Sequence, residues 1–344
     1  MKKPAFAAVV IALAGLGAIL LIRTSARVDA YRTLEMALAT DVLTDYSGQV
    51  RVRESNAAPT SYTIIHERPN RDFIYYTSPR PHTLLVVRRS DRAVCMDPKS
   101  GEVFSVPGSG TRSMKLAPRL IRGNYNIRIV GRETMANRKA IHLSVTPKYS
   151  RLSRRELWVD AEKYLVLCSR DLDVNGKMLY EERFIEVDYS APNRPVITTK
   201  VNEKMTKAVP LASRVDPKTM SKDLGFNVSA PSRIPRGYVM LGTYLSECPC
   251  GCGAKAALFR YTDGLNSLSV FQTIHLVGQC GSGTAATMVV KEGHCAIIRS
   301  GRDTMAVMQK HGVHVIAIGN LPAQILGGVA NGVDASTAKA PAAG

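Results

Sequence analysis

The sequence predicts a mainly β protein of the α+β class, with a curled antiparallel half-barrel that holds a plugging helix and a smaller C-terminal α+β domain. Three observations indicate this class. Short alternations of apolar and polar residues recur from Gln49 to Val187, one amphipathic segment precedes them, and a proline-rich stretch separates them from a second set. Period-two alternation is typical of half-buried strands. A chain of 344 residues has room for two such cores.

The N-terminus is typical of an exported protein. Lys2 and Lys3 precede an uncharged apolar run at 4–22, which ends at Arg23. The run is long enough for a signal-peptide core or for a single membrane-spanning helix. Val28-Asp29-Ala30 offers the small residues that a signal peptidase reads. We therefore expect residues 1–30 to be a cleaved signal peptide or a retained anchor, and the rest to lie outside the cytoplasm.

The charge of the chain limits its partners. A formal net charge of +18 favours anionic surfaces, such as nucleic acid, phospholipid or lipopolysaccharide phosphate, or an acidic protein. Export argues against nucleic acid. The remaining candidates are lipid headgroups and envelope proteins.

Residues 30–43 place Leu34, Met36, Ala37, Ala39 and Leu43 roughly on one face, which predicts an amphipathic helix. Strands follow at even spacing, separated by clusters of turn residues, and a Gly/Ser/Pro-rich interruption is expected at 104–120. We expect roughly ten or eleven strands in this half. A sheet that wide must curl or close, and the helix at 30–43 is a natural plug for its concave face.

The stretch from Ser153 to Tyr189 predicts a three-stranded meander around Trp158, the only tryptophan of the chain. A short polar turn at 160–163 joins its first two strands. Asn175-Gly176 stands where a type I′ turn needs two residues that tolerate positive φ. Trp158 is expected to be a structural anchor of the sheet.

The second half predicts a compact α+β domain. Residues 191–222 hold several prolines and lysines and are expected to be a linker, or a pair of strands followed by a linker. Residues 223–333 alternate again, with turns at Asp263-Gly264 and Lys310-His311-Gly312. An apolar segment from 321 to 333 is expected to be the last helix. Residues 334–344 are rich in alanine and are expected to be a disordered tail.

The order of several short motifs resembles the MucB/RseB family of sigma-E regulatory proteins. These motifs are YSGQVRVR, VVRR leading to VCMDP, ELWVD with LYEERFIEVDY, FNVSAPSRIPRGYVMLGTY, LFRYTDGLNSLSVFQ and MAVMQKHGVHVIAIGNLPAQIL, and they extend over residues 31–332. The resemblance implies that 31–190 form a domain similar to the lipoprotein carriers LolA and LolB, a half-barrel over an apolar cavity. It further implies that 223–333 bind a protein partner.

Two functions are consistent with this resemblance. The first is a periplasmic regulator that restrains a stress sigma factor by binding the outer region of an anti-sigma factor, and that senses lipid, lipopolysaccharide or lipoprotein acyl chains in its cavity. The second is a LolA/LolB-like carrier or anchored chaperone of lipids or lipoproteins without a transcriptional role. The sequence contains neither GxSxG nor HExxH. We therefore expect a binding protein rather than an enzyme, with no cofactor and no metal.

A basic stretch at 112–155 contains Glu133 as its only acidic residue. It is either a solvated face or a surface that attracts the anionic groups of lipids or of a partner. The apolar residues between its charges, such as Met114 and Leu120, suit the lip of a cavity that takes acyl chains. The candidate residues for an anionic ligand or partner are Arg112, Lys115, Arg119, Arg122, Arg128 and Arg132.

Seven cysteines in an exported chain indicate disulfides and one leftover thiol. The sharpest cluster is Cys248, Cys250 and Cys252, with Cys280 and Cys295 downstream as partners for two of them. The alternative is a zinc site, which alternate-residue cysteines on a strand serve poorly because successive side chains diverge. Cys95 and Cys168 are expected to form a second bridge or to be small core residues.

Overall fold

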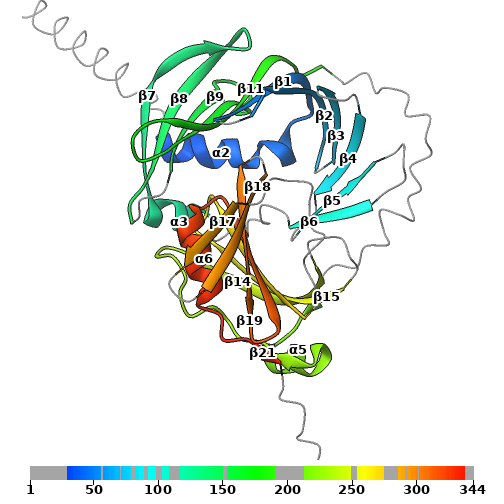
Figure 1. Ribbon diagram of the computed structural model, residues 1–344. Helices are drawn as coiled ribbons and strands as arrows, with labels where there is room; N and C mark the ends of the chain where they lie inside the picture. Colours follow the sequence, from blue (N-terminus) through cyan, green and yellow to red (C-terminus); the bar gives the residue numbers. More distant parts are fainter. Residues whose placement is uncertain are drawn as a thin grey trace, which may run out of the picture.

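The computed structural model describes residues 29–337, apart from 56, 70, 79–81, 89–91, 98–102, 108–116, 150–152, 191–212, 249–253, 275–285, 291–292 and 301. Two antiparallel sheets build two domains that face each other (Figure 1). The larger sheet arches over one long helix, and the second domain closes the open side of the arch (Figure 1). The predicted class, a mainly β protein with a curled sheet and a smaller α+β domain, is confirmed.

The N-terminal domain is one sheet of eleven strands with two helices. The strand order is β6-β5-β4-β3-β2-β1-β11-β10-β9-β8-β7, so that the meander of β9, β10 and β11 lies between the two halves of the sheet. The elements are α2 (Ala30–Leu43), β1 (Tyr46–Glu54), β2 (Thr60–Glu67), β3 (Arg71–Ser78), β4 (His82–Arg88), β5 (Arg92–Met96), β6 (Val103–Pro107), α3 (Ala117–Asn124), β7 (Tyr125–Met135), β8 (Arg138–Pro147), β9 (Arg154–Asp160), β10 (Val166–Leu172) and β11 (Met178–Asp188).

Helix α2 has the bounds that its amphipathic pattern predicts, and it fills the concave side of the sheet. Asp29 caps its first turn, because its carboxylate accepts a hydrogen bond from the backbone N–H of Tyr31 at 3.0 Å. Leu34 is fully buried in one cluster with Leu143 and Leu157 of the sheet. Burial of one such leucine stabilises the fold by about 1.5–3 kcal/mol. The buried face of α2 comprises Thr33, Leu34, Ala37 and Thr40, whereas Leu43, which was expected on the same face, is 53% exposed.

Trp158 lies on the opposite, convex side of the sheet. Its neighbours Leu157 and Val159 face α2, so the alternation along β9 turns the indole away from the helix. The ring is 4% exposed and is covered by His142, whose ring centroid lies 4.2 Å away, and by the guanidinium of Arg170, 5.0 Å from its centroid. The expected anchor of the meander is thus packed between two polar side chains.

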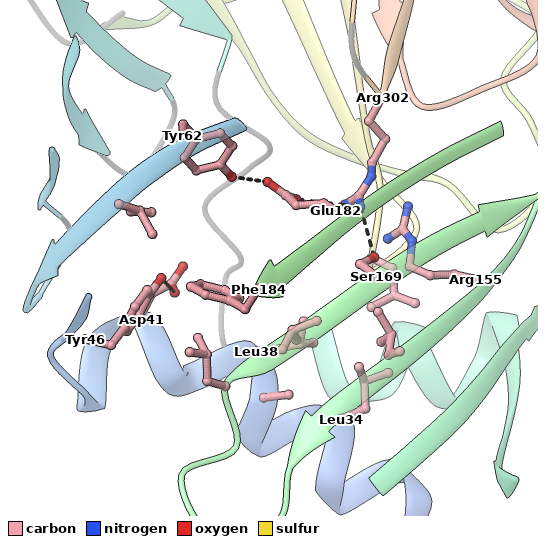
Figure 2. Close-up of a pocket in the computed structure, with 16 residues that line it drawn as sticks. Leu34, Leu38, Asp41, Tyr46, Tyr62, Arg155, Ser169, Glu182, Phe184 and Arg302 are labelled. Carbon is pink, nitrogen blue, oxygen red and sulfur yellow. Dashed lines mark hydrogen bonds and ion pairs between the residues drawn. The ribbon is translucent and has the colours of Figure 1, made fainter. Parts of the chain in front are cut away.

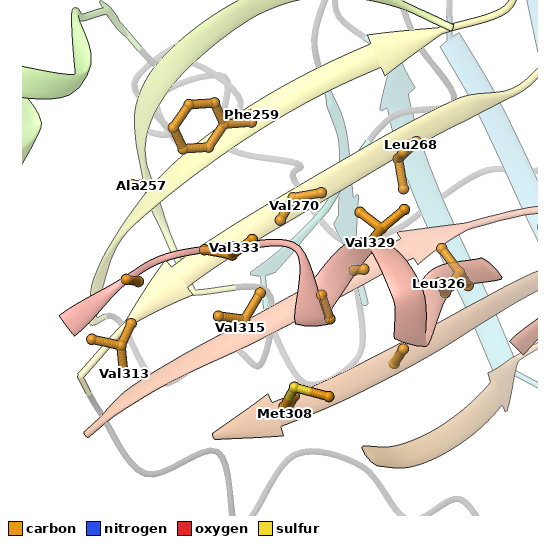
Figure 3. Packing of buried hydrophobic residues seen from close by; sticks show 14 of the residues in the cluster. Ala257, Phe259, Leu268, Val270, Met308, Val313, Val315, Leu326, Val329 and Val333 are labelled. Carbon is orange, nitrogen blue, oxygen red and sulfur yellow. The ribbon is translucent and has the colours of Figure 1, made fainter. Parts of the chain in front are cut away.

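The C-terminal domain is an eight-stranded sheet with α6 packed on one face. The strand order is β12-β14-β15-β16-β20-β19-β18-β17, and β13 pairs with β21 in a separate ribbon. Its elements are β12 (Ser213–Arg214), α5 (Pro217–Leu224), β13 (Phe226–Asn227), β14 (Val239–Glu247), β15 (Lys255–Thr262), β16 (Ser267–Thr273), β17 (Ala286–Val290), β18 (Gly293–Ser300), β19 (Asp303–Lys310), β20 (Val313–Gly319), α6 (Ala323–Asn331) and β21 (Ser336–Thr337). Figure 3 shows Leu326 and Val329 of α6 against Val270 and Val315 of the sheet, within the core of this domain.

Several elements differ from their predicted ranges. Strand β6 and helix α3 lie partly inside the interruption expected at 104–120. Helix α5 occupies part of the expected linker and buries Met220 in the C-terminal core, because Asp216 caps its start and Gly225, at φ 71°, ends it. Strand β21 lies in the expected tail.

The turn at Asn175-Gly176 is not the expected type I′ turn. Gly176 has a positive φ of 82°, but Asn175 does not. The carboxylate of Asp173 accepts hydrogen bonds from the backbone N–H groups of Asn175 and Lys177, each at 2.8 Å. This side chain stabilises a longer loop, in which only the glycine needs the left-handed conformation.

Candidate functional site

A cavity of about 240 Å³ lies between α2, the concave face of the large sheet and the C-terminal domain (Figure 2). One end is apolar and the other is polar. Its lining comprises Leu34, Ala37, Leu38, Asp41, Tyr46, Tyr62, Ile64, Arg155, Leu157, Leu165, Val166, Ser169, Glu182, Phe184, Leu265 and Arg302. Such a lining suits a molecule with an apolar part and a polar group.

The apolar end is built from residues that recur at the periods of a helix and of a strand. Leu34 and Leu38 stand one turn apart on α2 and point to the same side. Phe184 of β11 faces them from the sheet and packs edge-on against Tyr46 of β1, with 6.0 Å between the ring centroids. Figure 2 shows these side chains converging on the same space. The side chains that line the apolar end of the cavity therefore also pack in the hydrophobic core of the domain.

The polar end is organised around Asp171 of β10, which is 2% exposed. One carboxylate oxygen accepts a hydrogen bond from Nε of Arg155 at 2.7 Å, and the other lies 3.0 Å from Nε of Arg302. Burial alone would raise the pKa of Asp171, but the charges of Arg155 and Arg302 outweigh it and hold the pKa below its usual value. Asp171 is thus a buried carboxylate between two arginines of different domains.

Arg302 enters this end from the C-terminal domain, at the turn between β18 and β19. Its guanidinium donates to Oγ of Ser169 at 2.9 Å and stacks on Tyr180 at 4.7 Å from the ring centroid. Figure 2 shows it beside Glu182, which accepts a short hydrogen bond from the hydroxyl of Tyr62. Burial and the nearby Glu182 charge raise the pKa of Tyr62 well above its usual value. The hydroxyl therefore stays protonated and acts as a donor.

A second set of polar contacts joins the domains beside the cavity. The hydroxyl of Tyr125 donates to the carboxylate of Asp263 at 2.5 Å and accepts from the side-chain amide of Asn266 at 2.8 Å. The side-chain amide of Asn124 reaches the carbonyl oxygens of Gly237 and Asp263, both at 2.8 Å. The Asp263-Gly264 turn expected in the sequence is therefore a contact point between the domains.

The basic residues predicted to bind an anionic group lie elsewhere. Arg112 and Lys115 are outside the described residues. Arg119 and Arg122 are exposed on α3, and Arg128 and Arg132 are exposed on β7; none of these four lines the cavity. Arg122 is engaged with Glu35 of α2 at 3.1 Å. A role of these residues in binding an anion stays a prediction.

Two arginines of the cavity were not among the predicted site residues. Arg155 belongs to the predicted basic stretch. The only signal that it faces inward was its position two residues before Leu157 on β9, because residues two apart on a strand point to the same side of the sheet. Nothing in the local sequence around Arg302 indicates that it reaches another domain. Its role depends on a contact between segments more than a hundred residues apart in the chain.

Of the predicted disulfide candidates, Cys250, Cys252 and Cys280 lie outside the described residues. Cys248 and Cys295 are buried in two different hydrophobic clusters of the C-terminal domain, so they are not bonded to each other. A bridge from this cluster therefore stays a prediction. In the N-terminal domain Cys95 and Cys168 are free and buried, and burial raises their pKa values to about 11 and about 12. They are core residues, which was one of the two alternatives.

The described residues contain no group of His, Cys, Asp and Glu side chains arranged to hold a metal ion. Among their helices, none combines the length and the apolar character that a membrane span requires. The apolar segment at 4–22 lies outside the described residues.

Together, the fold and the cavity define a two-domain architecture, in which a curled antiparallel sheet and its helix form a pocket that the second domain closes. Residues 78–209 match the sequence profile of the MucB/RseB N-terminal domain. The resemblance of this chain to the MucB/RseB family is thereby confirmed. A search of curated protein sequences returns no match.

Solved structures of MucB show the same fold across both domains. A chain of the Pseudomonas aeruginosa MucA/MucB complex superposes with a TM-score of 0.58 and 19% identity, covering 91% of this chain and 100% of that one. MucB in complex with MucA(peri) gives 0.56 and 20%, covering 90% and 100%. A crystal structure of MucB gives 0.55 and 17%, covering 89% and 97%. At these identities the likeness shows the fold alone.

Proposed function

We propose that this protein is an envelope regulator of the MucB/RseB type. By binding the outer region of a membrane-bound anti-sigma factor it restrains an extracytoplasmic stress sigma factor, and it senses the acyl chains of a lipid, lipopolysaccharide or lipoprotein in its cavity. It acts by binding and not by catalysis. The observation that carries the proposal is a cavity lined by both domains, in a fold shared with proteins solved together with MucA.

The mechanism is a shift between domain arrangements. A ligand changes an equilibrium only if it binds the two arrangements with different affinities. Leu265 and Arg302 of the C-terminal domain line the cavity, so the affinity for a ligand depends on where that domain sits. By linkage, binding of a partner to one arrangement changes the affinity for the ligand by the same factor.

The alternative is a LolA/LolB-like carrier or anchored chaperone without a transcriptional role. It uses the same cavity beneath α2, which is lined mostly by the N-terminal domain. Co-purification from detergent-solubilised membranes, followed by mass spectrometry of proteins and lipids, separates the two functions. Recovery of a single-pass anti-sigma protein supports the regulator, and recovery of lipids or lipoproteins without such a protein supports the carrier. We place the protein in the periplasm, with residues 4–22 as the export signal or anchor.

Filling the cavity is expected to weaken lipid binding. Leu38→Trp adds an indole to the apolar end, and a fluorescent fatty acid should then bind at least about tenfold more weakly, because the lost burial of a few methylenes contributes about 0.8 kcal/mol each. Fluorescence titration measures the affinity. Val42→Trp is the matched control, one helical turn further on and 44% exposed outside the cavity lining. Equal binding by both variants would show that the lipid binds elsewhere.

The basic surface outside the cavity is expected to attract anionic lipid over a distance. Arg119→Glu combined with Arg128→Glu should weaken binding to vesicles that contain phosphatidylglycerol and should reduce its dependence on salt, because fewer exposed charges remain to be screened. Flotation at several salt concentrations measures this. Lys218→Glu combined with Lys222→Glu, at two exposed lysines of α5 in the other domain, is the charge-matched control. If the double variant binds like wild type, these arginines are only a solvated face.

A further inference from the structure

The C-terminal domain reaches the polar end of the cavity through the β18–β19 hairpin, and also through Asn266, which accepts a hydrogen bond from Arg155, and Asn320, which donates one to Asp171. Arg302 lies between β18 and β19, and Figure 1 shows β18 extending from its own sheet toward α2. The side chain contacts the N-terminal domain at Ser169, Asp171 and Tyr180, and lies 3.9 Å from Glu182. All of these partners belong to β10 and β11. Arg302 therefore docks on two adjacent strands at the mouth of the cavity.

This contact can open at limited cost, because Asp171 has a partner in its own domain. When Arg302 withdraws, Arg155 still holds the carboxylate of Asp171 at 2.7 Å. A buried carboxylate left without any partner would be strongly destabilising. Arg302 itself is 29% exposed in the docked state and becomes hydrated on release. The two arginines thus make a contact that holds the domains together and yet can be broken without stranding a charge.

The cavity is too small in this arrangement for a whole amphiphile. Its volume of about 240 Å³ is less than the ~300–1,000 Å³ of most ligand pockets. Leu265 and Arg302 are the lining residues that move if the C-terminal domain moves. Their withdrawal would enlarge the cavity at its polar end and open it to solvent. A whole amphiphile therefore needs a more open arrangement than the docked one.

We propose that the β18–β19 hairpin is a reversible lid, with Arg302 as its latch, and that a single-chain amphiphile with an anionic head opens it. The acyl chain occupies the apolar end beneath α2, and the anionic head competes with Asp171 and Glu182 for Arg302. Opening of the lid removes the contacts that Arg302 makes between the domains and so weakens their docking, which Tyr125 and Asn124 also support at the β15–β16 turn. The ligand part of this inference rests on the proposed function, whereas the lid itself does not.

The test compares Arg302→Met with Arg299→Met in the purified full-length protein. Methionine keeps the unbranched apolar part of the side chain and removes its charge, and Arg299 is an exposed arginine near the end of β18, just before the turn that holds Arg302. Hydrogen exchange at the β18–β19 and β15–β16 turns should rise roughly tenfold in Arg302→Met, the factor expected for the loss of one charge-assisted contact. Arg299→Met should exchange like wild type. Arg302→Lys should restore part of the protection.

Ligand coupling is read with dansyl-undecanoic acid and its methyl ester, which lacks the anionic head. The acid should raise exchange at both turns of the wild-type protein more than the ester does, and it should associate faster with Arg302→Met. The proposal of a lid is wrong if hydrogen exchange in Arg302→Met equals that of wild type. It is also wrong if the acid binds to wild type without changing hydrogen exchange. If Arg302→Met opens but no form of the protein binds the acid, the lid stands and the lipid-sensing part of the proposed function fails. Unfolding followed by Trp158 fluorescence confirms that each variant is folded.

Discussion

Replacing Asp72 with asparagine is expected to destabilise the N-terminal domain by about 3–5 kcal/mol in mildly acidic solution, and by less in alkaline solution. Asp72 and His66 are both fully buried, and the carboxylate lies 2.6 Å from Nδ1 of the ring. Nε2 lies 2.8 Å from the backbone carbonyl of Asp41, at the end of α2. Both ring nitrogens thus face acceptors, which favours the doubly protonated ring. The pair joins β2 and β3 to the helix that lines the cavity.

The pH dependence follows from the pKa of His66. Burial lowers this pKa, but the hydrogen bond and the charge of Asp72 outweigh burial and raise it above the ordinary 6.5. A raised pKa in the folded state contributes stability that is complete below 6.5 and is lost as the pH rises through the folded value. Asp72→Asn removes the cause of the shift. The difference between variant and wild type should therefore shrink as the pH rises.

Urea unfolding at a series of pH values measures this effect. Trp158, the only tryptophan, reports on the N-terminal domain. Asp45→Asn is the control, because Asp45 is an exposed carboxylate just after the end of α2 and pairs with Arg68 at 3.0 Å. Exposed ion pairs contribute only about 0–1 kcal/mol. A loss in Asp72→Asn that matches the control, or that does not vary with pH, would contradict the assignment of a charged pair.

The regular elements were predictable because each depends on residues close together in the chain. The apolar stripe of α2 and the alternation of β9 appear at their helical and strand periods, and the turns at Asp263-Gly264 and His311-Gly312 stand where the structure has positive φ values at Gly264, His311 and Gly312. Helix α5 also depends on residues close together in the chain. Its capping residues Asp216 and Gly225 were present in the sequence, but the prolines and lysines around them indicated a linker.

The polar end of the cavity could not be predicted in this way. Asp171 meets Arg302 only because the β18–β19 hairpin reaches β10, and no periodicity within either segment encodes that contact. Charge density pointed instead to the basic stretch at 112–155, whose exposed arginines on α3 and β7 do not line the cavity, and of which Arg122 pairs with Glu35. A dense run of like charges marks exposed surface, because burial of so many unpaired charges is unfavourable. Arg302, by contrast, can line the cavity because the buried carboxylate of Asp171 pairs with it.

The β15–β16 turn is expected to tolerate no side chain at Gly264, where docking of the domains depends on a close approach of backbones. A Cβ atom there would lie 2.9 Å from Cβ of Leu120 and 3.0 Å from the backbone nitrogen of Ile121, both on α3 of the other domain. The φ of Gly264 is +102°, which also disfavours any other residue. Gly264→Ala should therefore combine backbone strain of about 1–3 kcal/mol with a clash that only separation of the domains relieves.

Gly176→Ala separates these two effects. Gly176 also has a positive φ, +82°, but no atom lies within 4 Å of its added Cβ. This control should show the backbone strain alone. Small-angle scattering should then report a larger radius of gyration for Gly264→Ala and an unchanged one for Gly176→Ala, and hydrogen exchange around Tyr125 should rise only in the former. The hydroxyl of Tyr125 loses Asp263 and Asn266 when the turn withdraws. If Gly264→Ala keeps the compact dimensions and the exchange protection of wild type, the turn yields without moving the domain, and the contact between Gly264 and α3 does not set the domain arrangement.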